Sequence, residues 1–175
     1  EAAVSFNFIA GQFVILSLPI DDKEGITRSY SIASAPSKDN IYELCIALKE
    51  DGIATNCIWK HVEIGTKLQS TGPFGKFVLP ELIDSDLFMI CTGTGVAPFR
   101  SMILDIYHNN IPHLNIYLIF GNRVKADILY NDEFIQLAAT YPEFNYMPVL
   151  SRETLESWNG YTGYVHPIYM GLITP

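Results

Sequence analysis

Apolar and polar positions follow different patterns in the two halves of the chain. In the first half, short runs rich in aromatic and β-branched residues are separated by turn residues, at 13–20, 29–34, 41–49 and 65–79. Such runs are typical of strands in an antiparallel barrel or sandwich. Residues 53–62 differ, because their apolar positions recur at helical spacing, so we expect a short helix after Gly52.

The second half predicts alternating strands and helices. Continuous apolar runs predict buried parallel strands, and amphipathic segments between them predict helices: strands 87–92, 114–121 and 144–151, helices 97–110 and 128–141. Strand, helix, strand, helix, strand is a doubly wound α/β unit. Residues 158–175 show no closing strand, so we expect this sheet to be incomplete at the C-terminus and the chain to be part of a longer one.

The change of pattern at 80–86 predicts two domains. Residues 1–82 would form an antiparallel β-barrel of Greek-key type, and residues 83–175 a Rossmann-like α/β domain with a doubly wound parallel sheet. The length of 175 residues and the hydrophobic fraction of 49% allow each domain a core.

The composition limits the classes of ligand and partner that we expect. The net charge of −8 disfavours nucleic acid and anionic membranes, so a phosphate would have to be held by local groups. No apolar stretch approaches the length of a membrane span. Cys45, Cys57 and Cys91 show neither disulfide nor zinc spacing, which favours reduced thiols, no metal site and a cytoplasmic protein.

A glycine-rich turn follows the strand at 87–92. In Thr92-Gly93-Thr94-Gly95 the glycines would let a ligand approach backbone N–H groups at a helix start, where Pro98 fits the first turn. The dinucleotide-binding fingerprint would also need an acidic residue about 20 positions on, at the tip of the next strand, and that tip holds none. A plain strand-to-helix turn would explain the pattern as well.

Three further groups could bind phosphate. Arg28 and Tyr30 would share one face of a strand, whereas Ser31 points to the other. Gly52-Ile53-Ala54-Thr55 would form an anion-binding helix start, which Asn56 could cap. Arg123 and Arg152 each follow a predicted parallel strand, with Ser151 beside the second. Taken singly, each group has a structural explanation: an edge strand, a capped helix, or surface ion pairs.

The order of these motifs is more specific than any one of them. R-x-Y-S, G-x-x-[ST], GPFG-x-F, TGTG-x-AP, a strand ending in FG, ILY-x-x-EF and SRE follow one another along nearly the whole chain. This order resembles the ferredoxin–NADP reductase family. Residues 92–102 and 119–134 are especially similar to the plant-type reductases.

The resemblance implies a flavin-binding barrel followed by a NAD(P)-binding domain. Arg28 would pair with the FAD pyrophosphate, Tyr30 would stack on the isoalloxazine, and Ser31 would hydrogen-bond near flavin N5. Ser29 is counted with these cofactor-binding residues. Cys45, Ile46 and Ala47 would line FAD, although the family has a lysine where Ala47 stands. The segment from Gly52 to Ile53, Ala54 and Thr55 would bind pyrophosphate oxygens.

The remaining residues would serve the nicotinamide nucleotide. Thr94 would approach the flavin ring, Gly93 and Gly95 would admit the nucleotide, and Asn122, Arg123, Ser151 and Arg152 would hold its ribose and 2′-phosphate. Hydride would pass between nicotinamide and flavin N5, with Ser31 and Thr94 as the catalytic candidates. The lack of an acidic residue after 114–121 favours NADPH over NADH.

The resemblance further implies an electron-carrier partner: a ferredoxin, a fused iron–sulfur domain or a haem protein. The family's C-terminal Cys-Gly strand and flavin-covering aromatic residue have no counterpart before Pro175. Two other readings stay open: a non-catalytic or regulatory flavin-binding subunit of a larger redox complex, and a flavin-free nucleotide-binding module.

Overall fold

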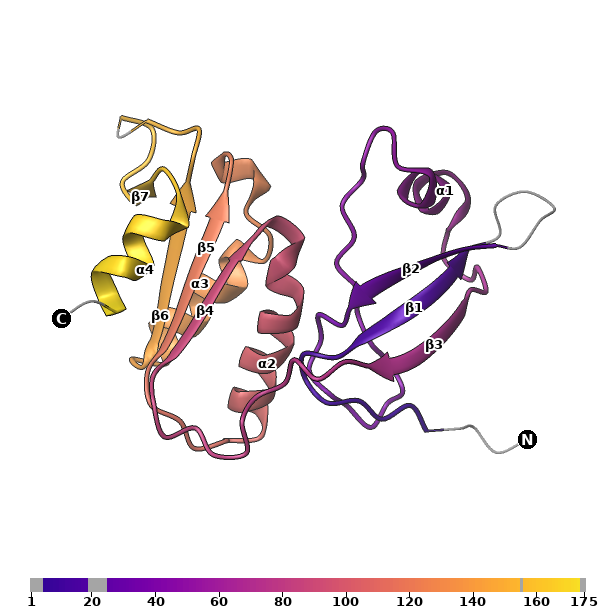
Figure 1. Ribbon diagram of the computed structural model, residues 1–175, viewed down its shortest axis with the longest axis horizontal. Coiled ribbons are helices and arrows are strands. Elements are labelled where there is room, and N and C mark those ends of the chain that lie inside the picture. Colours follow the sequence, from indigo (N-terminus) through magenta and orange to yellow (C-terminus); the bar gives the residue numbers. More distant parts are fainter. Residues whose placement is uncertain (1–4, 19–24, 155, 174–175) are drawn as a thin grey trace. The chain divides into compact units, whose positions relative to one another are not determined.

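The computed structural model describes residues 5–18, 25–154 and 156–173. The chain forms two compact units (Figure 1). One unit groups Glu1–Leu79 with Ala97–Asn109, and the other groups Pro80–Val96 with Asn110–Pro175. The antiparallel part thus precedes the α/β part, as the sequence predicts.

The first unit is built on an antiparallel sheet with the strand order β2-β1-β3. Its strands are β1 (Phe13–Leu18), β2 (Ile26–Ser31) and β3 (Gln69–Phe74). Helix α1 (Ile53–His61) contacts β1 and β2, and its bounds agree with the predicted helix within one residue. The core cluster of this unit contains Phe8, Val14, Leu16 and Ile32.

The strand predicted at 41–49 is not a regular strand. Among the described residues its backbone forms one isolated bridge, between Leu44 and Ile32, the residue after β2. The alternation that predicted it is real, because Tyr42, Leu44 and Ile46 pack against the core cluster. Side-chain alternation therefore placed the segment correctly against the core, but no neighbouring strand supplies a continuous hydrogen-bond ladder.

The second unit holds a parallel sheet with the order β4-β5-β6-β7. Its strands are β4 (Leu87–Thr92), β5 (Ile116–Asn122), β6 (Phe144–Leu150) and β7 (Tyr161–Thr162). The three long strands confirm the prediction. The expectation that no strand follows them is wrong, because β7 pairs with β6; two residues are too few to show a periodicity.

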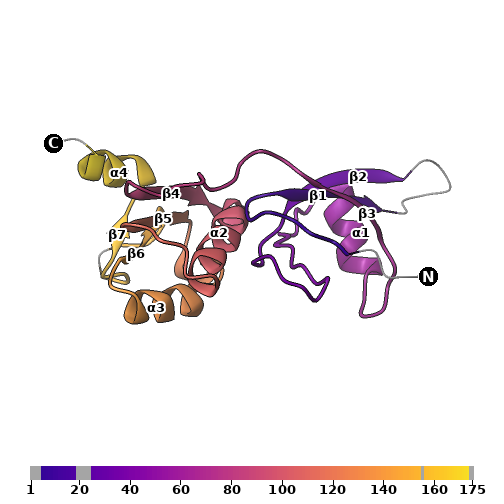
Figure 2. The same cartoon turned by 90° about the horizontal axis from the view of Figure 1, so that it is seen from below.

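Two helices cover opposite faces of the parallel sheet (Figure 2). Helix α4 (Val165–Ile173) packs Val165 against Ile119 and Val149. Helix α3 (Asn131–Thr140) places Phe134 against Phe120 and Phe144 on the other face. Burial on both faces explains why these strands read as continuous apolar runs.

Helix α2 (Val96–His108) begins directly after a 3₁₀ turn at Gly93–Gly95. Contacts group Ala97–Asn109 with the first unit, although the sequence assigned the helix to a domain spanning 83–175. The domain limits 1–82 and 83–175 stay a prediction. Within the described part of the chain, no helix combines the length and apolarity needed to cross a bilayer.

Candidate cofactor-binding sites

Strand β2 carries the first group of candidates. In its antiparallel register with β1, Arg28 lies opposite Leu16 and Tyr30 opposite Val14, so both share the face that bears the core residues. Tyr30 is half-buried and packs against the core cluster, whereas Arg28 is exposed. Arg28 Nη1 donates to the Thr27 carbonyl oxygen at 2.8 Å, and among the described residues most of the guanidinium donors are left for a ligand.

The two side chains are also electrostatically linked. Burial raises the pKa of the Tyr30 phenol, and the nearby Arg28 guanidinium opposes that rise. Ser29 and Ser31 lie on the other face of β2, opposite Ile15 and Phe13. The sheet therefore offers a cation and an aromatic ring together on one face, with hydroxyl groups on the other.

The start of α1 is an uncapped helix N-terminus. Gly52 occupies the N-cap position, and no side chain bonds to the first backbone N–H groups, those of Ile53, Ala54 and Thr55. The Thr55 hydroxyl instead donates to the carbonyl oxygens of Lys49 and Gly52, at 3.2 Å each. A Cβ at Gly52 would lie 2.7 Å from Thr55 Oγ1, so only glycine fits this tight loop.

Asn56 does not cap α1. Its Nδ2 donates to the carbonyl oxygens of Lys49, Glu50 and Gly52, at 2.8–3.1 Å. A cap would need the side-chain oxygen to accept from an N–H of the first turn. Asn56 therefore folds the preceding loop back onto the helix, and the N–H groups of the first turn stay available for an anion.

The segment from Cys45 to Ala47 is extended. Cys45 and Ile46 are half-buried and Ala47 is exposed. The bridge between Ile32 and Leu44 pairs the backbone up to Cys45, and within the described ranges the backbone N–H and C=O groups of Ile46 and Ala47 have no backbone partner. Such backbone groups take their hydrogen bonds from water or from a ligand, so they are available to a cofactor.

In the second unit, the glycine-rich turn lies at the carboxyl end of β4. Gly93 has φ +51°, and a Cβ built there would meet nothing within 4 Å. The space beside Gly93 is therefore open, and its backbone conformation favours glycine. Thr94 and Gly95 are exposed. Open sheets of this class bind ligands at this edge.

The end of β5 and the loops after β5 and β6 bring four predicted residues together. Ser151 N donates to the Asn122 carbonyl oxygen at 3.0 Å, and Arg152 N donates to the Arg123 carbonyl oxygen at 2.9 Å. Ser151 Oγ also donates to the Asn122 carbonyl oxygen, at 3.3 Å. Asn122 is buried, while both arginines are exposed. Parallel pairing places these loops at the same sheet edge as the glycine-rich turn, because Thr92 lies beside Gly121.

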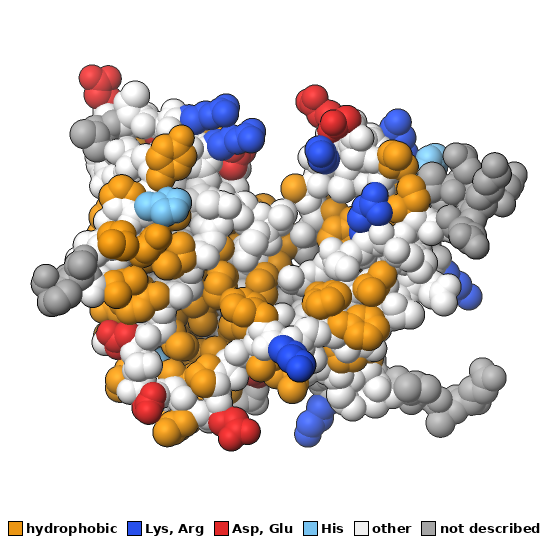
Figure 3. All heavy atoms as spheres, viewed as in Figure 1, with side chains coloured by type: hydrophobic (Ala, Val, Ile, Leu, Met, Phe, Trp, Pro, Cys, Tyr) orange, Lys and Arg blue, Asp and Glu red, His pale blue; other side chains and the backbone are white. Residues whose placement is uncertain are grey.

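This edge concentrates the positive charge of the second unit. Residues 80–96 and 110–175 contain nine acidic residues and three basic ones: Arg123, Lys125 and Arg152. All three basic residues follow β5 or β6, and basic side chains gather where these strands end (Figure 3). An otherwise acidic unit therefore has one edge suited to a phosphate.

Glu153 organises the same edge. Its carboxylate accepts from Lys125 N at 3.2 Å and from Ser157 Oγ at 2.8 Å. These hydrogen bonds, that from Ser157 first, lower the pKa of Glu153. The carboxylate thus binds backbone and hydroxyl donors, and among the described residues it forms no ion pair with Arg123 or Arg152.

The sequence interpretation missed several residues. Gly121 lies so close to α4 that a Cβ would be 2.9 Å from Val165 Cγ1. A glycine at the end of an apolar strand was the available signal. Arg100 and Ser101 lie on α2 with little or no exposure. Their signal was two consecutive polar residues inside an apolar helix.

Comparison with protein families assigns both halves. Residues 1–79 match the oxidoreductase FAD-binding domain, and residues 89–171 match the oxidoreductase NAD-binding domain. The residues described above fit these ligands. The exposed guanidinium of Arg28, the uncapped start of α1 and the backbone groups of Ile46 and Ala47, which have no partner among the described residues, fit FAD. The open turn at Gly93 and the basic edge fit a nicotinamide nucleotide.

Sequence comparison with individual proteins supports the same assignment. The chain is 38% identical over 161 residues to the reductase component of phenol 2-monooxygenase from Pseudomonas sp. (strain CF600), covering 91% of this chain and 44% of that protein. The chain therefore spans under half the length of this curated relative.

Two crystal structures share the fold. The Amycolatopsis cytochrome P450 reductase GcoB has a TM-score of 0.85 at 28% identity, covering 98% of this chain and 51% of that one. The ferredoxin–NADP⁺ reductase from Neisseria gonorrhoeae, with bound FAD and NADP, has a TM-score of 0.76 at 28% identity, covering 98% and 68%. The two matched domains, their order along the chain and these relatives show that the chain belongs to the ferredoxin–NADP reductase family of FAD- and NAD(P)-binding oxidoreductases.

Proposed function

We propose that this chain is the flavin- and nicotinamide-binding part of a reductase that takes electrons from NAD(P)H and passes them to a protein acceptor. The observation that carries the proposal is the presence of both cofactor-binding folds in one chain, each with its own group of residues suited to a phosphate. A module for a single nucleotide would need only one of these groups.

In the first unit, Arg28 and the N–H groups of Ile53, Ala54 and Thr55 would hold the FAD pyrophosphate. A guanidinium group and a helix N-terminus both favour a bound anion. Ser29 lies next to Arg28 on β2, and Gly52 occupies the N-cap position of α1; both are proposed to belong to the FAD site. Tyr30 supplies an aromatic ring on which the isoalloxazine can stack, and its half-buried position against the core fixes that ring. Cys45, Ile46 and Ala47 offer backbone hydrogen bonds to the same cofactor.

In the second unit, Gly93, Thr94 and Gly95 would admit the nicotinamide nucleotide, and Asn122 and Ser151 would hold its ribose. The proposal assigns the 2′-phosphate of NADPH to Arg123 and Arg152, whose adjacent backbones place two guanidinium groups on one sheet edge. We therefore expect NADPH to be preferred over NADH. The concentration of all three basic residues of this unit at that edge supports the preference.

When bound, FAD supplies the chemistry of accepting electron pairs from the nicotinamide and releasing electrons singly or in pairs. The protein's own contribution is binding and orientation. Ser31 is proposed to hydrogen-bond the flavin ring, and the exposed Thr94 to border the nicotinamide. The acceptor is proposed to be an oxygenase component, or an iron–sulfur or haem carrier, in a cytoplasmic system. The names of the phenol 2-monooxygenase and cytochrome P450 reductases support this class of partner.

The test is to purify the protein and measure bound flavin. We expect a yellow protein whose flavin absorbance bleaches on addition of NADPH without oxygen, and which then reduces ferricyanide or cytochrome c. Flavin that binds but does not bleach with either NADPH or NADH would favour the regulatory subunit. A protein that takes up no FAD would contradict the proposal.

Arg28→Ala tests the FAD assignment directly. Loss of hydrogen bonds to a charged group should weaken FAD binding by about tenfold or more. Lys67→Ala is the matched control, because Lys67 is an exposed cation of the same unit outside the assigned site. If FAD affinity is the same in Arg28→Ala and Lys67→Ala, Arg28 does not hold the pyrophosphate. A protein that takes up no FAD and binds a nicotinamide nucleotide equally well with and without Arg28 would favour the flavin-free nucleotide-binding module.

A further inference from the structure

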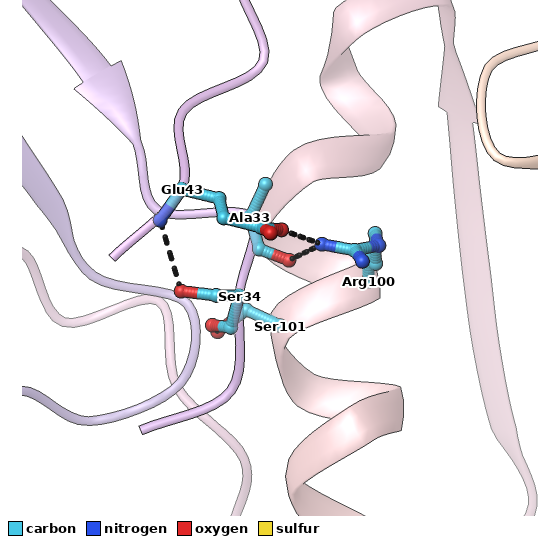
Figure 4. Close-up of polar contacts among 5 residues, drawn as sticks. All are labelled: Ala33, Ser34, Glu43, Arg100 and Ser101. Carbon is cyan, nitrogen blue, oxygen red and sulfur yellow. Dashed lines mark hydrogen bonds and ion pairs between the residues drawn. The ribbon is translucent and has the colours of Figure 1, made fainter. Parts of the chain in front are cut away.

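The middle of α2 carries two polar side chains that reach the loop after β2. Arg100 Nη1 donates to the Ala33 carbonyl oxygen at 2.9 Å and lies 2.7 Å from Glu43 Oε2 (Figure 4). Ser101 is fully buried, and its hydroxyl donates to the Ser34 carbonyl oxygen at 2.6 Å. We call Arg100, Ser101, Ala33, Ser34 and Glu43 the α2 clasp.

The clasp also joins two loop segments to each other. Ala33 N donates to the Glu43 carbonyl oxygen at 2.8 Å, and Glu43 N donates to Ser34 Oγ at 3.1 Å. The bridge between Ile32 and Leu44 continues this pairing. Arg100 binds one residue of each segment, so its guanidinium sets how the two segments lie against α2.

These two loop segments directly adjoin β2 and the segment Cys45–Ala47, both of which we assign to the FAD site. Ala33 follows the last residue of β2, Ser31, by two positions. Glu43 precedes Cys45 by two positions. A shift of either clasp segment would therefore move Ser31 and Tyr30 on one side, or the backbone of Cys45–Ala47 on the other.

The chemistry of the clasp requires arginine. The Arg100 side chain is only 12% exposed, and such a charge is tolerated where it is paired and hydrogen-bonded. A planar guanidinium can serve the Ala33 carbonyl and the Glu43 carboxylate at once, in fixed directions. A lysine ammonium would keep the charge but lose the fixed geometry.

We propose that Arg100 is a positioning residue for FAD: through Ala33 and Glu43 it fixes the spacing between β2 and the segment Cys45–Ala47, without itself touching the cofactor. This inference rests on the proposed function, because it takes FAD as the ligand of the first unit. Glu43 contributes by binding the Arg100 guanidinium with its carboxylate. Ser101 holds the loop after β2 in the same way, through its hydrogen bond to the Ser34 carbonyl oxygen.

The dissociation constant of FAD tests the proposal, measured on the apoprotein by quenching of flavin fluorescence. Arg100→Ala should raise it by about tenfold, because only part of the free energy of the lost hydrogen bonds is felt at the two segments that bind FAD. Arg100→Lys should recover only part of the affinity. Glu43→Gln should raise the constant by about threefold, because the bond to Ala33 remains. Arg100→Ala and Glu43→Ala should not add when combined.

A second variant on the same helix distinguishes a positioning role of Arg100 from a general contribution to the stability of the fold. Ile106→Ala removes a fully buried side chain outside the clasp, so it should lower the unfolding midpoint at least as much as Arg100→Ala. Its FAD affinity should nevertheless stay within about twofold of wild type, given that it leaves the hydrogen bonds intact.

Three results would overturn the inference: an unchanged FAD affinity in Arg100→Ala, an equal loss in Ile106→Ala, or full recovery in Arg100→Lys. If Arg100→Ala does not fold, Glu43→Gln serves as the deciding variant. The Glu43 side chain is 57% exposed, so we expect this substitution to leave the core intact. An unchanged FAD affinity in Glu43→Gln would also overturn the inference. Wild-type protein that takes up no FAD would instead overturn the proposed function, and this inference with it.

Discussion

The backbone N–H of Arg152 donates to the carbonyl oxygen of Arg123 at 2.9 Å, so two loops that follow different strands run side by side. Both side chains are exposed, and among the described residues neither forms an ion pair with Asp127 or Glu153. Glu153 is occupied by Lys125 N and Ser157 Oγ. Within the described part of the chain, neither guanidinium group is engaged by these carboxylates, which is consistent with the proposed 2′-phosphate site.

We expect Arg152→Ala to lower the ratio of kcat/KM for NADPH to that for NADH by about tenfold. The physical reason is that a 2′-phosphate gains charge-assisted hydrogen bonds from arginine, whereas the 2′-hydroxyl of NADH does not. Steady-state kinetics with both nucleotides measures the ratio. Lys38→Ala, an exposed cation of the first unit, should leave it unchanged. A constant ratio in Arg152→Ala would remove the basis for NADPH preference.

Gly93→Ala should weaken nicotinamide nucleotide binding more than it weakens the fold. Gly93 has φ +51°, and Gly65 has φ +94°; a Cβ at either would meet no atom within 4 Å. Both alanine variants should therefore lose about 1–2 kcal/mol of unfolding free energy from backbone strain. Only Gly93→Ala should raise the KM for NADPH, because its methyl group enters the space proposed for the nucleotide.

Denaturant unfolding and steady-state kinetics on the Gly93→Ala and Gly65→Ala pair distinguish the two effects. An equal change of KM in both variants would mean that strain alone is responsible, and that the turn at Gly93 does not contact the nucleotide.

Gly121→Ala should destabilise the second unit through overpacking. The new Cβ would lie 2.9 Å from Val165 Cγ1 and 3.0 Å from Thr92 Cγ2. Such crowding costs about 1–3 kcal/mol. Adding Val165→Ala should recover part of the loss, because it removes one of the two crowding methyl groups. Unfolding free energies of the single and double variants give the coupling, and purely additive effects would contradict the close approach of α4.

Cys91 should be the least reactive thiol of the chain. Burial raises the pKa of Cys91 to about 12, so almost none of it is thiolate at pH 8. N-ethylmaleimide at pH 8 should label the half-buried Cys45 and Cys57 in the native protein, and Cys91 only after unfolding. Peptide mass spectrometry measures each site. Native labelling of Cys91 as fast as Cys45 would contradict its burial.

The same raised pKa gives a dependence of stability on pH. The folded protein keeps the Cys91 proton where the unfolded chain would release it, so this contribution to stability is complete below the unfolded pKa of about 8.5. It is lost progressively as the pH rises towards the folded pKa. Unfolding midpoints between pH 8 and 10.5 should therefore fall more steeply in wild type than in Cys91→Ala.

Periodicity identified most regular elements because their side chains are sorted by burial. Strands β4, β5 and β6 are covered on both faces, and they therefore give the short continuous apolar runs that are typical of strands in a parallel sheet. The half-buried β1 alternates instead, with every second residue inside. The segment 41–49 shows the limit of this signal, since alternating side chains packed against a core need no continuous hydrogen-bond ladder.

The candidate site was predictable to the extent that its chemistry lies in consecutive residues. Arg28 and Tyr30 share a face because strands have a period of two, and the turn at Gly93 needs glycine for its backbone angle. The sequence by itself thus determined the order of most elements, the candidate cofactor-binding motifs and the charge available to each.

Only the tertiary structure decided which distant residues meet. The pairing of Arg123 with Arg152, the approach of Val165 to Gly121 and the bonds of Arg100 to Ala33 and Glu43 join positions that no local period relates. Such contacts depend on strand order and on how helices pack, and both are fixed by the burial of the whole chain and not by neighbouring residues.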